Sequence, residues 1–357
     1  MSHLRGLFLA GFLAVLAGCS SRVTSPTGNV ARPAPHSWED LGLGVAPGDA
    51  VAMAVYGGKL VVGGWFFRAA GTARTSLVQW DGSRWTSIDK QLDGDVAALL
   101  PYGGELAIGG SFTRVAGDSM GYVASWNGSR WKALAGGTDW NVFALAEYGG
   151  DLIAAGDFLH AGGVSATKLA RWDGTAWHAL GAGADNSVLA LTVYRGRLIA
   201  GGFFSRAGTA AASFVAAWDG TSWSPLGTGV NGPVTVLSVH RDTLVAGGLF
   251  SEAGGVPALH VACWTGAAWD SLGGGLGEPR TDSVDALATF NDQLVAGGSF
   301  LRTGFHASRW NAGYWLGLGF LDGPVHSYAV YQGRLIAGGA FRNNRIPGAN
   351  VVARWNE

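Results

Sequence analysis

The chain has 357 residues, with 24 lysines and arginines against 25 aspartates and glutamates. Its length allows one large domain or two domains of ordinary size. Because the net charge is close to zero, the chain has no basic excess to neutralise phosphates, and this excludes nucleic acid as an expected partner.

The N-terminus has the pattern of a bacterial export signal. Arg5 precedes an apolar run that ends at Gly18, too short to cross a bilayer as a helix of about 20 apolar residues. The run closes on L-A-G-C, which resembles the lipobox whose cysteine becomes the first mature residue and carries the lipid. The resemblance implies a signal peptide over residues 1–18 and a lipid on Cys19. Ser20 implies sorting to the outer membrane of the cell envelope, so the membrane is an expected partner through the anchor.

Residues 19–36 form a tether between this anchor and the folded part. After the cysteine they are rich in Ser, Thr and Pro and have almost no large apolar side chain. Such a composition favours a flexible to semi-extended linker. We therefore expect the folded domain over residues 37–357.

The folded part repeats one unit seven times. Fourteen of the 16 tryptophans fall into two columns with steps of 45 to 47 residues, and a phenylalanine column accompanies them. Self-similarity at this period indicates an array of small supersecondary units. The columns are Trp80, Trp126, Trp172, Trp218, Trp264, Trp310 and Trp355; Trp38, Trp85, Trp131, Trp177, Trp223, Trp269 and Trp315; and Phe66, Phe112, Phe158, Phe204, Phe250, Phe300 and Phe341.

The fourth unit shows four strand signals, a to d in chain order. A tight turn at R-G joins strand a to strand b, and D-G is a strong hairpin signal between strand c and strand d. Strand b lacks polar alternation, so both its faces should be buried between units, and we interpret its Gly-Gly pair as room for tryptophan rings to approach the backbone. The expected strands are 188–194, 198–204, 214–218 and one that begins near Trp223. Four strands at this period predict an all-β fold, a seven-bladed β-propeller of four-stranded blades.

The two ends of the folded part complete each other. The chain enters it with a strand d, residues 37–42, and closes with a strand c, residues 351–355. Trp38 and Trp355 fill the two tryptophan positions that elsewhere share one hairpin. We therefore predict that N-terminal strand d pairs with C-terminal strand c and closes the ring, which covers both open edges.

The repeat resembles a known family. The run L-[IV]-x-G-G-x-F, followed by A-x-W-[DN]-G-x-x-W-x-x-L-G, is similar to the repeats of the fungal cortical marker for cell polarity and, more distantly, to kelch repeats. The likeness covers residues 37–357 and implies a propeller. It departs at Ala155-Gly156, where alanine replaces the first glycine. These families share their architecture across many functions, so the likeness implies no activity.

Two tryptophans lie outside the repeat. The tight turns occupy one face of the ring, so any site is expected on the opposite, more variable face or in the central channel. Trp65 and Trp140 belong to this variable face, and Trp140 is flanked by Asp139 and Asn141. An indole provides a flat apolar surface and its polar neighbours can bond hydroxyls, so we predict a carbohydrate-like ligand. The other interpretation is that each ring fills a gap between loops.

A mostly basic column lies on the same face, two residues after each phenylalanine. It is a candidate rim for binding anions. The other interpretation is that these residues form ion pairs with an aspartate column that precedes strand a. Exposed ion pairs contribute little to stability. The basic residues are Arg68, Arg114, His160, Arg206 and Arg302; the aspartates are Asp93, Asp139, Asp185 and Asp322.

Catalytic and metal patterns are not evident in the sequence. His260 and His306 share one template position in adjacent blades, and two such points are too far apart for one metal ion. The W-D-G-T turns resemble the Asp box of sialidases only superficially, because their aspartate and glycine are adjacent. No Ser-His-Asp spacing, phosphate loop or paired carboxylate stands out. We assign no catalytic residue, metal or cofactor.

Three functional hypotheses remain. The leading one is a non-catalytic scaffold in the cell envelope, periplasmic or surface-exposed, that binds a protein or a carbohydrate. The alternative is a glycan-acting enzyme, a hydrolase or lyase, with an unidentified site at the channel mouth. A close set of acidic or histidine side chains with shifted pKa values at that mouth would favour the enzyme. A purely structural role is the third hypothesis, and a variable face without pockets would favour it.

Overall fold

The computed structural model describes residues 37–41, 48–69, 72–88, 92–279, 281–300, 305–342 and 350–357. The predicted signal peptide, the tether with Cys19 and the candidate Arg302 lie outside these ranges, as does the side chain of Arg68. The described part is built of strands, and none of it forms a helix of the length and hydropathy needed to cross a membrane.

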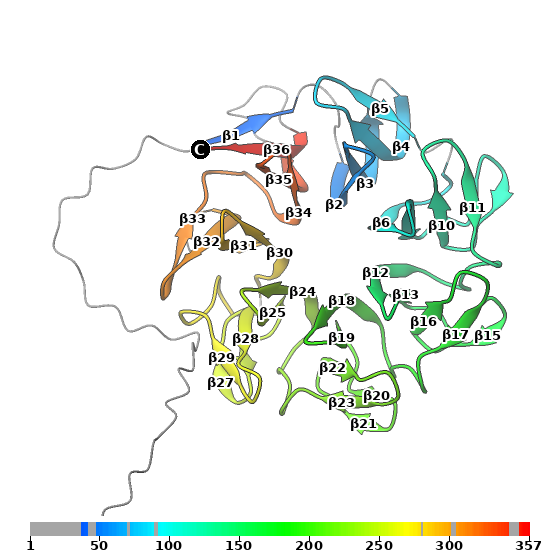
Figure 1. Ribbon diagram of the computed structural model, residues 1–357. Coiled ribbons are helices and arrows are strands. Elements are labelled where there is room, and N and C mark those ends of the chain that lie inside the picture. Colours follow the sequence, from blue (N-terminus) through cyan, green and yellow to red (C-terminus); the bar gives the residue numbers. More distant parts are fainter. Residues whose placement is uncertain are drawn as a thin grey trace, which may run out of the picture.

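Within the described residues, seven four-stranded sheets stand around a central channel, which confirms the predicted seven-bladed β-propeller (Figure 1). Blades 1 to 3 are β2 (Gly48–Tyr56), β3 (Lys59–Ala69), β4 (Thr72–Trp80) and β5 (Trp85–Ser87); β6 (Val96–Tyr102), β7 (Glu105–Gly110), β10 (Val123–Trp126) and β11 (Trp131–Ala133); and β12 (Val142–Tyr148), β13 (Asp151–Gly156), β16 (Leu169–Trp172) and β17 (Trp177–Ala179). Blades 4 to 6 are β18 (Val188–Tyr194), β19 (Arg197–Gly202), β22 (Val215–Trp218) and β23 (Trp223–Pro225); β24 (Val234–His240), β25 (Thr243–Gly248), β28 (Val261–Trp264) and β29 (Trp269–Ser271); and β30 (Val284–Phe290), β31 (Gln293–Gly298), β32 (Ala307–Asn311) and β33 (Tyr314–Gly317). Blade 7 is β34 (Val325–Tyr331), β35 (Arg334–Arg342), β36 (Asn350–Asn356) and β1 (Ser37–Asp40).

Small hairpins form between the second and third strands of blades 2 to 5. The Gly- and Ala-rich stretch of the repeat was not expected to hold strands, yet it folds back on itself there. These hairpins are β8 (Arg114–Val115) with β9 (Asp118–Ser119), β14 (His160–Ala161) with β15 (Val164–Ser165), β20 (Arg206–Ala207) with β21 (Ala210–Ala211), and β26 (Glu252–Ala253) with β27 (Val256–Pro257).

The ring closes as predicted, with β1 pairing antiparallel to β36. Trp38 lies opposite Trp355, and their rings meet edge to face with centroids 5.2 Å apart. In Figure 1 the blue N-terminal strand and the red C-terminal strand lie side by side in one blade. β1 thereby covers the edge that β36 would otherwise expose.

In six of the seven blades, the outer tryptophan is bonded to the preceding blade. The indole Nε1 of Trp177 donates to the carbonyl of Leu134 over 2.6 Å, and Trp223 donates to Leu180 over 3.1 Å. Each bond joins the fourth strand of one blade to the residue that directly follows the fourth strand of the blade before it. The same bond is made by Trp85 to Leu41, Trp269 to Leu226, Trp315 to Leu272 and Trp38 to Leu318.

The Gly-Gly pairs do not make room for tryptophan, so that interpretation was wrong. A Cβ on Gly109 would lie 2.6 Å from Cγ1 of Val142 in the next blade, and one on Gly110 would collide with the backbone carbonyl of Asp95 in its own blade. The tryptophan rings instead approach the glycine of the L-G motif: a Cβ on Gly181 would lie 3.0 Å from Cζ3 of Trp218. The Gly-Gly pair therefore allows the close approach of the next blade on one side and of the neighbouring strand on the other.

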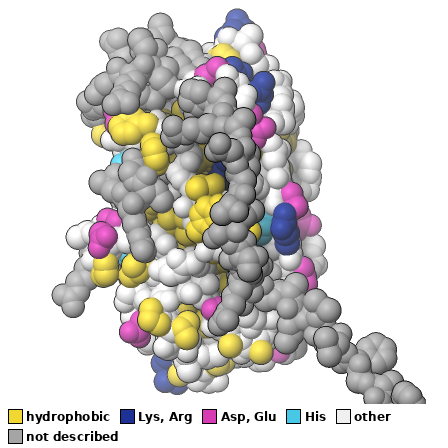
Figure 2. All heavy atoms as spheres, turned by 90° about the vertical axis from the view of Figure 1, so that its left-hand side faces the viewer, with side chains coloured by type: hydrophobic (Ala, Val, Ile, Leu, Met, Phe, Trp, Pro, Cys, Tyr) yellow, Lys and Arg dark blue, Asp and Glu magenta, His cyan; other side chains and the backbone are white. Residues whose placement is uncertain are grey.

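The core lies between blades rather than in one central cluster. The seven repeat phenylalanines are 0–2% exposed, and the buried residues fall into clusters that each span adjacent blades. Seen from the side, the ring presents hydrophobic side chains between its two faces, with acidic and basic side chains toward the edges of the view (Figure 2).

Candidate functional site

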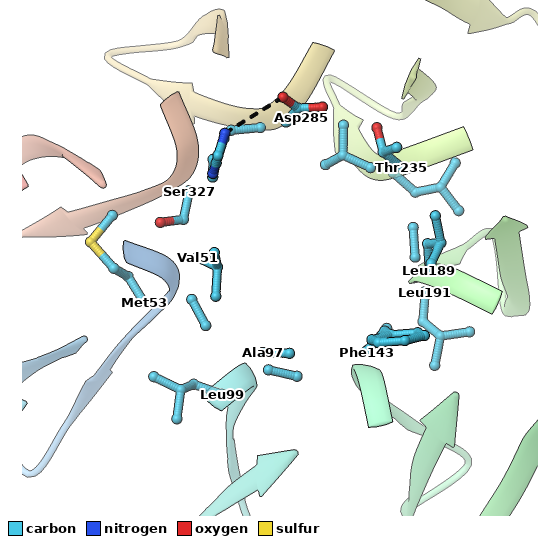
Figure 3. Close-up of a pocket in the computed structure, with 18 of the residues that line it drawn as sticks. Val51, Met53, Ala97, Leu99, Phe143, Leu189, Leu191, Thr235, Asp285 and Ser327 are labelled. Atoms are coloured by element: carbon cyan, nitrogen blue, oxygen red, sulfur yellow. Dashed lines mark ion pairs between the residues drawn. The ribbon is translucent and has the colours of Figure 1, made fainter. Parts of the chain in front are cut away.

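Seven bulges, one in each blade, direct a ring of side chains into the channel. The first strand of every blade pairs with the second through a register shift at the same template position. A bulge adds one residue to a strand and re-aims its side chain. The residues at the seven bulges are Val51, Ala97, Phe143, Leu189, Thr235, Asp285 and His326, and they line a cavity of about 450 Å³ (Figure 3).

Two of the seven are ionisable, and a third ionisable side chain joins them. The imidazole Nδ1 of His326 lies 2.9 Å from Oδ1 and 3.0 Å from Oδ2 of Asp49. Its Nε2 lies 4.0 Å from Oδ2 of Asp285, the pair marked by the dashed line in Figure 3. Ser283 donates its hydroxyl to the same carboxylate oxygen over 3.0 Å. Blades 1, 6 and 7 thus bring an Asp-His-Asp cluster to the channel mouth.

Burial and mutual charge shift the pKa values of this cluster. Burial weighs against a charged imidazole, but the hydrogen bond that it donates to Asp49 and the charges of both carboxylates outweigh burial and raise the pKa of His326. Burial also raises the pKa of Asp285, against the Ser283 hydroxyl and the charge of His326. The pKa of each group is raised by a different cause, burial for Asp285, and the hydrogen bond to Asp49 with the charges of both carboxylates for His326.

Sequence reasoning missed the cluster, although one signal was present. The bulge column is apolar or hydroxylic in five blades, and Asp285 and His326 are its two ionisable members. Aligning strand a of each unit would have shown this departure. Asp49 gives no such signal, because Asp95 occupies its template position in blade 2.

Trp65 lines a second cavity, between blades 1 and 2 on the variable face. Its side chain is 44% exposed. The cavity has a volume of about 240 Å³, and its polar lining includes Thr75, Asp93 and Asp95. Trp65 also lies directly opposite Asp49 in the β2–β3 register, so this aromatic residue adjoins the channel mouth. The site thus places an indole face beside carboxylates and a hydroxyl.

Trp140 lies at the next blade boundary, between blades 2 and 3. It is 54% exposed, and its ring lies 6.2 Å from that of Tyr122, tilted by 32°. Asn141 is half-buried, and its carbonyl accepts the backbone N–H of Asp157 over 2.9 Å. Both non-repeat tryptophans therefore flank blade 2 and leave much of their surface to solvent.

The aspartate column bonds backbone rather than arginine side chains. Asp139 accepts the N–H groups of Leu159 and His160 over 2.8 and 2.9 Å, and its Oδ2 lies 2.7 Å from Nδ1 of His160. Burial would raise the pKa of Asp139, but these bonds outweigh it and lower the pKa. Asp93 and Asp185 hold the equivalent N–H groups of blades 2 and 4.

The described arginines of the basic column are held by their own hairpins. Arg114 donates a guanidinium N–H to the carbonyl of Gly117 over 2.8 Å, and Arg206 donates to Thr209 over 3.0 Å. Both side chains are exposed at the small hairpins, in blades 2 and 4 respectively. The structure therefore places Arg114, His160 and Arg206 in separate blades, each within its own loop.

The two template histidines bond backbone carbonyls. Nε2 of His260 lies 2.9 Å from the carbonyl of Glu278, and Nδ1 of His306 lies 3.1 Å from that of Gly298. Among the residues that the structure describes, no group of three or more histidines, cysteines or carboxylates could hold a metal ion.

Solved structures that resemble this chain include WD40 propellers. The chain is similar to the extracellular domain of a putative hybrid two component system from B. thetaiotaomicron, with a TM-score of 0.62 and 9% identity, and it spans 39% of that chain while 90% of this one is covered. It is also similar to the WD40 beta propeller domain of Doa1, with a TM-score of 0.58, 15% identity and coverage of 90% and 97%. The RRP9 WD40 repeats match at a TM-score of 0.58, 15% identity and coverage of 90% and 99%. At such identities the likeness shows the fold alone.

No family model and no curated protein matches the sequence. The resemblance to the fungal cortical marker and to kelch repeats therefore stays a prediction. What the chain does must be argued from its site rather than from a relative.

Proposed function

We infer that the protein is a binding propeller of the bacterial cell envelope whose variable face takes a carbohydrate. The observation that carries this proposal is the pair of exposed tryptophans, Trp65 and Trp140, at successive blade boundaries. Tryptophan is well buried in most folds, so two half-exposed indoles on one face mark a contact surface. Sugar rings present apolar C–H faces that stack on indoles, and their hydroxyls bond carboxylates.

The position of the two rings favours an extended ligand. Trp65 borders blade 2 from one side with Asp95 and Thr75 in its cavity, and Trp140 borders it from the other with Tyr122 against its ring. A ligand that contacts both must cross the top of blade 2. An oligosaccharide has this reach, whereas a single sugar ring engages one tryptophan at a time.

Replacing either tryptophan should weaken glycan binding while leaving the fold intact. We expect Trp65→Ala and Trp140→Ala each to weaken binding of an oligosaccharide identified by array screening by about tenfold or more, since a central tryptophan contributes about 2 kcal/mol or more. Isothermal titration measures the affinity. The matched control is Phe203→Ala, an exposed aromatic in the Trp65 column of blade 4, which should leave the affinity unchanged. Equal losses in all three variants, or unfolding of the Trp140 variant, would contradict the proposal.

The enzyme hypothesis has one observation in its favour, the Asp49–His326 pair at the channel mouth. An imidazole held by a carboxylate, with its second nitrogen toward a cavity, is an arrangement that general bases use. Incubating the bound glycan with the protein and examining it for cleavage tests this reading. Cleavage that His326→Ala abolishes would establish the hydrolase or lyase.

The envelope location rests on the sequence and on one neighbour. The lipobox at Cys19 implies an outer-membrane lipoprotein, and the B. thetaiotaomicron structure that resembles this chain is an extracellular domain. Propellers of this shape occur outside cells, so the two observations agree.

Exchange of the lipobox cysteine should release the protein from membranes. A lipid anchor contributes about 0.8 kcal/mol per buried CH₂ group, and residues 20–36 have no apolar segment to replace it. We expect Cys19→Ser to move the protein from the membrane fraction to the soluble fraction, with Ser20→Ala as the control that stays bound. A Cys19 variant that remains in the membrane pellet at high salt would contradict the lipid anchor.

A further inference from the structure

The channel mouth is divided into an apolar half and a polar half. Blades 1 to 4 direct Val51, Ala97, Phe143 and Leu189 into it, and blades 5 to 7 direct Thr235, Asp285 and His326 (Figure 3). The cavity volume of about 450 Å³ falls in the range of small-molecule sites. A ligand that fits both halves has an apolar body and one polar end.

The charge of the polar half determines whether the polar end of the ligand should be a cation or an anion. Asp49 and Asp285 face a single imidazole, so with both carboxylates ionised the cluster carries net negative charge whether His326 is neutral or protonated. Asp95, at the template position of Asp49, adds a further carboxylate on the same face. An anion would meet repulsion here, whereas a cation would be attracted.

The contacts within the cluster leave acceptor positions directed at the cavity. Asp49 is engaged with His326, but Asp285 lies 4.0 Å from the imidazole, beyond hydrogen-bond range, and accepts the Ser283 hydroxyl over 3.0 Å. A carboxylate has about four acceptor positions. Thr235 donates its hydroxyl to the carbonyl of Val284 over 2.8 Å, and its oxygen keeps acceptor capacity. Several acceptors and a partly desolvated charge thus border the same cavity.

We propose that the channel mouth binds an organic cation, an ammonium or guanidinium group on an apolar stem. The charged end bonds Asp285 and the Thr235 oxygen, and the stem lies against Phe143 and Leu189. A desolvated carboxylate is stabilised by such a partner, and the stem gains from leaving water. This site is separate from the carbohydrate surface of the proposed function, and the ligand is either a free amine or a lysine or arginine side chain of a polypeptide.

Titration calorimetry with the full chain tests the site with three probes. Hexylamine represents a free amine, the peptide acetyl-Gly-Lys-Gly-amide represents a protein side chain, and hexanol has the same stem without the charge. We expect at least one cation to bind and hexanol to bind at least tenfold more weakly. Tighter binding of the peptide assigns the site to a polypeptide, and tighter binding of hexylamine assigns it to a small amine.

Two variants keep the test decisive. Asp285→Asn should weaken cation binding at least tenfold, whereas Asp242→Asn, the same charge change at an exposed turn, should leave it unchanged. Should the Asp285 variant fail to fold, Ala97→Phe fills the apolar half and should abolish binding without touching the cluster. Trp65→Ala should not alter cation binding, which separates this site from the carbohydrate surface.

Three results would overturn the proposal. Hexanol binding as tightly as hexylamine would show that charge is not recognised, and unchanged affinity in the Asp285 or Ala97 variant would place the cation elsewhere. If neither cation bound at millimolar concentration, the channel mouth would not be a cation site. Glycan cleavage that depends on His326, in a protein that binds no amine, would assign the cluster to catalysis instead.

Discussion

A chain that begins at Gly42 should unfold at a much lower urea concentration than a chain that begins at Ser37. The shorter chain lacks β1, and with it Trp38, whose side chain is 2% exposed. Removing a buried tryptophan costs about 3–5 kcal/mol. The strand also pairs with β36 over four residue pairs, so the whole loss should exceed about 5 kcal/mol. That is comparable with the entire stability of many domains.

Removal of β1 also removes hydrogen bonds to both neighbouring blades. The Trp38 indole donates to Leu318 of blade 6 over 2.6 Å, and the carbonyl of Leu41 accepts the Trp85 indole of blade 1 over 3.0 Å. Glu39 pairs with Arg354 over 2.9 Å. Without β1, the outer edge of blade 7 is open and blades 6 and 1 each lose a bond to it.

Urea titration followed by tryptophan fluorescence measures the difference, and gel filtration shows whether the open edge of β36 pairs with a second chain. The chain that begins at Ser37 is the matched control, since it lacks the signal peptide and tether and keeps the strand. Equal unfolding midpoints and slopes for the two chains would show that the ring does not depend on this closure.

The repeat architecture was predictable because one interaction scheme is used seven times. Each blade must bury one phenylalanine and place two tryptophans, so the columns at Phe204, Trp218 and Trp223 recur with nearly constant spacing. The split blade followed from the same columns, because Trp38 and Trp355 are the members that lack a partner in their own hairpin. Burial that recurs at a fixed spacing can therefore be predicted from the sequence without any knowledge of the contacts.

The channel cluster was not predictable, because its members meet only when the ring closes. Asp49 and His326 are 277 residues apart and come from blades 1 and 7. Their meeting depends on the bulges that turn one residue of each first strand toward the axis. A period-2 pattern gives the faces of a strand but not the position of a bulge.

The aspartate column shows a second limit of reasoning from sequence. The sequence left open whether the basic column forms ion pairs with the aspartate column. His160 and Asp139 do so over 2.7 Å, but Arg114 and Arg206 bond carbonyls of their own hairpins. The carboxylates instead accept backbone N–H groups at the start of each small hairpin, such as that of Arg114 over 2.8 Å. Every residue except proline has a backbone donor that must be satisfied. A sequence displays charges but not these donors.

The Gly-Gly motif combines two different requirements that the sequence cannot separate. A Cβ on Gly201 would lie 2.5 Å from Cγ1 of Val234, a side chain of the next blade. A Cβ on Gly202 would collide with the backbone carbonyl of Ser187, which accepts the backbone N–H of Phe203 over 2.9 Å. Side chains can shift by some tenths of an ångström, whereas a bonded backbone cannot. Blade 3 agrees, because it has Ala155 at the first position and keeps glycine at the second.

Adding one methyl group at each position should therefore have unequal effects. We expect Gly202→Ala to lower the free energy of unfolding by about 3 kcal/mol or more, since β19 must separate from β18 to relieve the collision. Gly201→Ala is the matched control and should cost about 1–2 kcal/mol, the usual result of overpacking a side-chain contact. Urea titration of both variants measures the difference. If Gly201→Ala cost as much as Gly202→Ala, the Ser187 carbonyl would not be the constraint, and the second glycine would have to be explained by packing between blades.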